Sequence, residues 1–189
     1  MTLLNGPDGY GGLTKALHWI ILVLFVFQFT AAAVMLNLGP NDALWGATQA
    51  NVYNWHKSIG LLALGLALVR IGVRNMGRLP GWAASLTARE RVLVHYYERL
   101  LYAGMLGLPA SGFVYVMAGG NGVHLFEIVH LANPIGKSVT LALVAKWVHI
   151  VSAYVILAAI AVHVGLVARH HVLLGNGLLW RMLPGRGHR

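Results

Sequence analysis

The 189-residue sequence contains no cysteine and only five acidic residues. The missing cysteines exclude disulfides, cysteine-ligated zinc, iron–sulfur clusters on cysteine and haem attached covalently through a C-x-x-C-H motif. Charged residues make up 10% and hydrophobic residues 58% of the chain, whereas soluble domains have about 25% and about 45–50%. This composition excludes disorder, coiled coils and an ordinary water-soluble globule, and it predicts an integral membrane protein.

Four apolar runs are long enough to cross a bilayer, which takes about 20 residues. They cover about residues 16–36, 53–73, 92–117 and 148–168. Another apolar stretch, Val139–Ala145, predicts either an extension of the last helix or a short surface helix. Before the third run, Ser85 or Thr87 is a candidate helix cap, with Glu90 three residues after Thr87. We expect an all-α membrane protein, with a four-transmembrane-helix bundle in a single domain over residues 1–189.

Positive charges are distributed unequally between the two sides of such a bundle. The side with both termini holds eleven of them: Lys15, Arg70, Arg74, Arg78, Arg89, Arg91, Arg99, Arg169, Arg181, Arg186 and Arg189. The other side holds Lys57, Lys137 and Lys146. The positive-inside rule therefore predicts that both termini are cytoplasmic. The net charge of +9 then reflects topology and contact with anionic membrane lipid, and no nucleic-acid partner is expected.

A cleaved signal peptide is an alternative interpretation of the N-terminus. It would use Lys15 as its charged region, Trp19–Phe29 as its apolar core and Ala31–Ala33 as the cleavage site. The apolar run is long and the leading segment has one positive charge against Asp8, which favours an uncleaved first span. Cleavage would remove His18.

Four of the ten histidines lie within or at the ends of the apolar runs, where polar residues are costly and tend to mark function. His149 and His163 are fourteen residues apart, which places them on one helix face about 21 Å apart. His18 begins the first span on the inner side, and His56 begins the second on the outer side. Depth therefore pairs His18 with His163, and His56 with His149. Two imidazoles at each of two depths fit two six-coordinate, non-covalent b-type haems enclosed by the bundle. For each histidine alone, a hydrogen bond to a neighbouring helix is the alternative.

Several motifs in a fixed order resemble the small four-helix type of the bacterial cytochrome b561 family, from about residue 10 to residue 185. The matching residues are Tyr10, Leu17-His18-Trp19, Asn54-Trp55-His56-Lys57-Ser58-Ile59-Gly60, Arg70, His95, Leu101-Tyr102, Pro109, Gly112, Lys146-Trp147, His149, His163, His170-His171 and Trp180-Arg181-Met182-Leu183-Pro184. One departure is an extra residue, Val148, between Trp147 and His149. The resemblance implies two haem b groups whose iron ligands are His18, His56, His149 and His163.

The resemblance also implies a multi-pass protein of the bacterial inner membrane that belongs to electron transport. The expected activity is that of an oxidoreductase, carrying electrons between a periplasmic donor and the quinone pool, with ubiquinone a candidate quinone. Some members of the family oxidise superoxide, and others serve periplasmic redox proteins. The predicted outer side has three positive charges against Asp42 and Glu127, which offers little electrostatic attraction for superoxide.

Reduction of a quinone requires protons as well as electrons. The predicted inner side offers His95, His170 and His171 as a candidate quinone or proton site, with Glu98 nearby in sequence. Snorkelling to the interface is the alternative role for each of them. His124 and His130 fall in the outer loop, where an electron donor could dock. Candidate partners of the haem propionates are Lys15, Arg70, Arg74 and Arg99 on the inner side and Lys57 and Lys146 on the outer side.

Two other classes of function remain open at this point. A histidine-lined transporter or metal-ion permease would usually have acidic residues inside its spans, and here only Glu98 qualifies, at the end of one. A structural membrane subunit without a cofactor is the other alternative.

Overall fold

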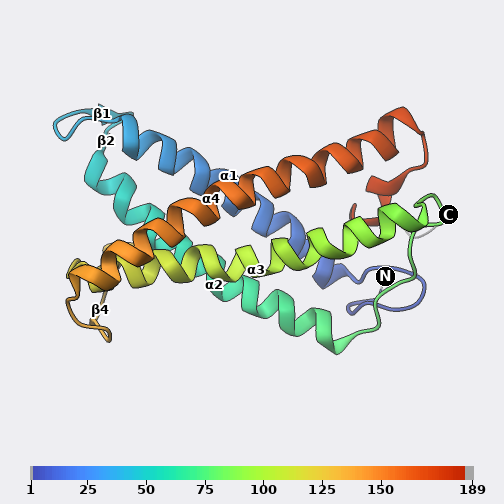
Figure 1. Ribbon diagram of the computed structural model, residues 1–189, viewed down its shortest axis with the longest axis horizontal. Coiled ribbons are helices and arrows are strands. Elements are labelled where there is room, and N and C mark those ends of the chain that lie inside the picture. Colours follow the sequence, from blue (N-terminus) through green and yellow to red (C-terminus); the bar gives the residue numbers. More distant parts are fainter. Residues whose placement is uncertain (1, 186–189) are drawn as a thin grey trace. The chain divides into compact units, whose positions relative to one another are not determined.

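The computed structural model describes residues 2–185, and four long helices dominate it (Figure 1). They are α1 (Gly12–Asn37), α2 (Gln49–Met76), α3 (Ala88–Ala118) and α4 (Val139–Ala168). Each is long and apolar enough to span a membrane, which confirms the predicted all-α membrane fold. Only 11–17% of the residues in the most apolar window of each helix are buried within the protein. The remaining apolar surface needs a second apolar medium, and a bilayer supplies it.

The helices extend beyond the apolar runs that predicted them. Helix α4 begins at Val139, so the stretch Val139–Ala145 continues this helix and forms no separate one. Helix α3 begins at Ala88, directly after the cap that the sequence indicated. The backbone N–H of Thr87 donates to Glu90 Oε2 at 2.9 Å, and the N–H of Glu90 donates to Thr87 Oγ at 3.3 Å. This reciprocal capping box sets the start of α3.

Two small antiparallel hairpins connect the helices. Strands β1 (Ala43–Leu44) and β2 (Ala47–Thr48) lie between α1 and α2. Strands β3 (Val123–Leu125) and β4 (Val129–Leu131) lie between α3 and α4. These strands are at most three residues long. They could not be predicted from the sequence, because such short segments show no clear alternation of apolar and polar residues.

The chain after α4 folds back onto the start of α1. It continues as a π-helical turn, η1 (Arg169–Leu173), and a 3₁₀ turn, η2 (Leu178–Arg181). Lys15 Nζ donates to the carbonyl of Leu183 at 3.1 Å, and Trp19 Nε1 donates to the carbonyl of Met182 at 2.9 Å. The guanidinium of Arg181 lies 5.7 Å from the centre of the Tyr10 ring, and burial raises the pKa of this tyrosine.

The described chain divides into two compact units. The first unit contains residues up to 20, 66–104 and from 153 onward, and the second contains residues 21–65 and 105–152. Each of the four long helices contributes a segment to both units. The two candidate histidine pairs fall in different units, His18 and His163 in the first and His56 and His149 in the second.

Candidate haem and electron-transfer site

The first unit brings together His18 of α1 and His163 of α4. Their ring centroids are 6.2 Å apart and the ring planes are inclined at 61°. Arg70 of α2 lies beside them, with Nη2 3.5 Å from His18 Nδ1 and Nη1 donating to the carbonyl of Thr14 at 3.3 Å. The guanidinium of Arg70 therefore lies at the edge of the histidine pair, where this positive charge could bind an acidic group.

The second unit brings together His56 of α2 and His149 of α4. Their ring centroids are 6.3 Å apart, with an interplanar angle of 88°. His149 Nδ1 lies 2.8 Å from the carbonyl oxygen of Leu108. A carbonyl only accepts hydrogen bonds, so Nδ1 carries the proton and Nε2 keeps its lone pair. A carbonyl that accepts this hydrogen bond holds the imidazole in an orientation in which its other nitrogen could bind a metal ion.

A glycine on α3 makes the Leu108 contact possible. A Cβ added at Gly112 would lie 2.8 Å from Cε1 of His149, closer than real Cβ atoms approach other atoms. The bare backbone at Gly112 therefore lets the imidazole reach the carbonyl of Leu108. In the sequence, Gly112 stands out only as part of the family resemblance, because its contact with His149 depends on how α3 and α4 pack.

The separations within both pairs fit one metal ion between two imidazoles. A metal–imidazole bond is about 2.0 Å long and the ring centroid lies about 1.1 Å beyond the nitrogen, so opposite ligands have centroids about 6 Å apart. The observed 6.2 and 6.3 Å match this value. The residues present therefore fit a bis-histidine haem at each pair, and ligation itself stays a prediction.

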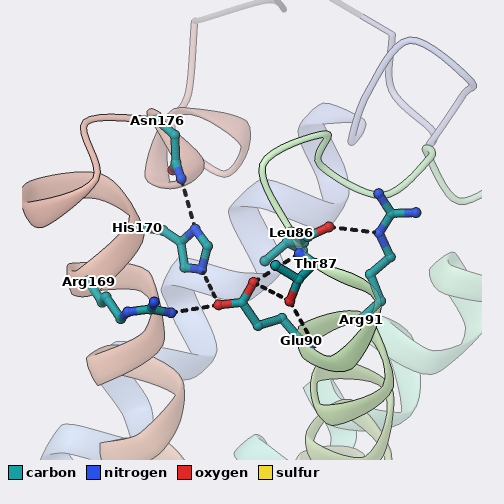
Figure 2. A network of polar contacts seen from close by, with 7 residues as sticks. All are labelled: Leu86, Thr87, Glu90, Arg91, Arg169, His170 and Asn176. Carbon is teal, nitrogen blue, oxygen red and sulfur yellow. Dashed lines mark hydrogen bonds and ion pairs between the residues drawn. The ribbon is translucent and has the colours of Figure 1, made fainter.

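The candidate quinone residues have three different surroundings in the first unit. His170 is 1% exposed, and both of its ring nitrogens have partners: Nε2 lies 3.1 Å from Glu90 Oε1, and Nδ1 lies 2.8 Å from Asn176 Nδ2 (Figure 2). His171 packs edge-on against the Trp180 ring, and its Nδ1 is buried with no hydrogen-bond partner in the described part of the chain. His95 is exposed, with its ring 6.3 Å from that of Tyr96.

Glu90 is the centre of the network that holds His170 (Figure 2). Its Oε1 also accepts a hydrogen bond from Arg169 Nη1 at 2.6 Å, while its Oε2 caps α3 through Thr87. One carboxylate therefore joins the beginning of α3 to the π-helical turn η1. Both ring nitrogens of His170 have hydrogen-bond partners in this network, which gives the residue a structural role that could not be predicted from the sequence.

Two arginines of α2 lie over the Tyr102 ring, with Arg70 at 5.7 Å and Arg74 at 5.4 Å from its centre. Arg74 is paired with Glu98, whose Oε1 lies 2.8 Å from Nη2. Its charge is compensated within the protein, whereas Arg70 contacts only neutral groups among these partners. Of the two, Arg70 is the better candidate for binding an acidic group of a cofactor.

Comparison with known proteins identifies the family of this chain. Residues 9–185 match the family model described as prokaryotic cytochrome b561. The chain is 23% identical over 183 residues to cytochrome b561 homolog 2 of Escherichia coli (strain K12). The aligned region covers 97% of this chain and 95% of the relative. The chain belongs to the prokaryotic cytochrome b561 family, whose members are multi-pass proteins of the bacterial inner membrane that bind haem b and transfer electrons.

Proposed function

We propose that this protein is a di-haem cytochrome that carries electrons across the inner membrane, from a periplasmic donor to the quinone pool. His18 and His163 would hold one haem b, and His56 and His149 the other. The main support is that each pair has a centroid separation, 6.2 or 6.3 Å, at which both imidazoles could bind one iron ion. The spacing of fourteen positions from His149 to His163 would hold the two haems at different depths of the bilayer.

The chemistry supplied by such a cofactor is one-electron exchange at an iron with no open coordination position. The protein's part is to hold the ligands and adjust their charge. The carbonyl of Leu108 fixes the tautomer of His149 and makes the imidazole a stronger donor. Arg70, beside His18, places a positive charge where a haem propionate would be stabilised.

The direction of transport rests on charge and on proton chemistry. The excess of Lys and Arg favours cytoplasmic termini. The segment with His95, His170 and His171 then lies on the cytoplasmic side, where quinone reduction would take up protons. Of these three, His171 is the best candidate for quinone contact because its buried Nδ1 has no hydrogen-bond partner among residues 2–185. The donor is superoxide or a periplasmic redox protein.

Single substitutions test the two ligand pairs. His163→Ala should remove about one of two haems per chain and leave the spectrum of the other, and His149→Ala should remove the complementary haem. His95→Ala, which removes an exposed imidazole from α3, is the matched control and should keep both haems. Haem content per chain and reduced spectra of the purified variants are the measurements. Full haem content in His163→Ala would refute the pairing in the first unit.

A further inference from the structure

The hairpin between α3 and α4 carries a pair of histidines that the haem proposal does not use. In the register of β3 and β4, His124 lies directly opposite His130. Their ring centroids are 4.5 Å apart, and Nδ1 of His130 lies 3.2 Å from Nε2 of His124. Both side chains are exposed to solvent, so an ion could reach the two nitrogens.

The distance between these nitrogens suits two ligands on one metal ion. With metal–nitrogen bonds of about 2.0–2.1 Å, neighbouring ligands are about 2.9 Å apart in square geometry and about 3.4 Å apart in tetrahedral geometry. The 3.2 Å between His124 and His130 falls inside this interval. Without metal the two nitrogens share a proton in a hydrogen bond, and an ion would take the place of that proton.

The hairpin is fixed by a buried side chain of α2. Ser58 is fully buried, and its Oγ accepts a hydrogen bond from the N–H of Phe126 at 2.9 Å and donates to the carbonyl of His124 at 3.4 Å. Val123, at the start of β3, is 2% exposed and anchors the strand. These contacts hold the backbone of His124 in place before any ion binds, which lowers the entropic cost of chelation.

A glycine makes room for the second ring. A Cβ added at Gly122 would lie 2.9 Å from Cε1 of His130, closer than real Cβ atoms approach other atoms. The imidazole of His130 therefore rests on bare backbone at Gly122, and this position directs it toward His124.

From this geometry we infer that the β3–β4 hairpin binds a divalent transition-metal ion, Zn²⁺ or Cu²⁺, through His124 Nε2 and His130 Nδ1. Imidazole nitrogen suits these ions, whereas Mg²⁺ and Ca²⁺ require oxygen ligands. No group of three His, Cys, Asp or Glu side chains able to hold a metal occurs within residues 2–185. Water completes the coordination, and the ion exchanges readily. The site uses none of the proposed haem ligands, and the proposed topology places it on the periplasmic side.

Zinc titration of the full-length haem-loaded protein tests this inference. The protein should carry a purification tag without histidine, and the binding of ZnCl₂ in detergent should be followed by calorimetry. We expect about one Zn²⁺ per chain in the wild type, and an affinity at least about tenfold lower in His124→Ala and in His130→Ala. His95→Ala is the matched control, since it removes an exposed histidine outside the hairpin, and it should bind as the wild type does.

Two further measurements separate loss of ligands from loss of structure. His130→Phe keeps a ring over Gly122 but offers no nitrogen, so it should lose zinc affinity while its haem spectrum stays unchanged. Paramagnetic resonance of Cu²⁺ bound to the oxidised wild type should show coupling to two imidazole nitrogens, and the single variants should lose this pattern. Unchanged zinc affinity in the double variant His124→Ala/His130→Ala, or no zinc binding by a wild type with its full haem content, would overturn the inference.

Discussion

At the scale of single residues, the site depends on close approach as much as on ligand identity. Gly112 lets the His149 ring touch α3, and the carbonyl of Leu108 then sets which nitrogen carries the proton. The side-chain Nε2 of Gln28 donates to the carbonyl of His56 at 2.9 Å, which connects α1 to the turn of α2 that carries His56. Neither contact could be predicted from the sequence, because each depends on how two helices pack. The pairing of the four candidate histidines could be predicted, because their depths follow from the hydropathy pattern.

The substitution Gly112→Ala tests the close approach. The new methyl group would overlap His149, so we expect loss of the Leu108 contact, a shifted spectrum and weaker retention of one haem. Gly107→Ala, on the same helix, is the matched control, because a Cβ at Gly107 would meet no atom within 4 Å. Both changes favour the helix intrinsically by about 0.5–1 kcal/mol, so propensity cannot explain a difference between them. Identical haem content and spectra in the two variants would contradict this role of Gly112.

At the scale of elements, the ends of the helices carry more information than their apolar centres. Hydropathy located all four helices, but it placed the start of the last one at residue 148, whereas α4 begins at Val139. The apolar stretch Val139–Ala145 allowed either an extension of this helix or a short surface helix, because hydropathy detects a length that crosses the bilayer and does not locate the end of a helix. The capping box at Thr87 could be predicted from the sequence because its two residues are only three positions apart. The contacts of Glu90 with Arg169 and His170 could not be predicted, because these residues lie about eighty positions from Glu90 in the sequence.

His170 should therefore matter for the stability of the connection between α3 and η1. His170→Ala removes two hydrogen bonds from a side chain that is 1% exposed, which should cost on the order of 2 kcal/mol of unfolding free energy. Thermal denaturation in detergent should show a lower midpoint for this variant, with both haems still bound before unfolding. His95→Ala, at an exposed position of α3, should leave the midpoint unchanged. Equal midpoints for the two variants would show that the Glu90 network does not stabilise this connection.

At the scale of the whole molecule, the sequence already separates the lipid-facing and functional parts of the chain. Exposed apolar side chains cover all four helices, while His18, His56, His149 and His163 face one another in two pairs. The short hairpins lay beyond prediction, and with them the pairing of His124 and His130, because cross-strand register comes from the turn and from Ser58. An isolated pattern such as His-x₅-His has many other structural explanations.

The proposed function requires two b-type haems in this chain, one at each histidine pair. The most direct test is a dithionite-reduced minus oxidised spectrum of the purified full-length protein, with haem quantified per chain. We predict a low-spin b-type spectrum and about two haems per chain. A protein that folds in the membrane but contains about one haem or none, when iron and haem precursor are supplied during expression, would contradict the account.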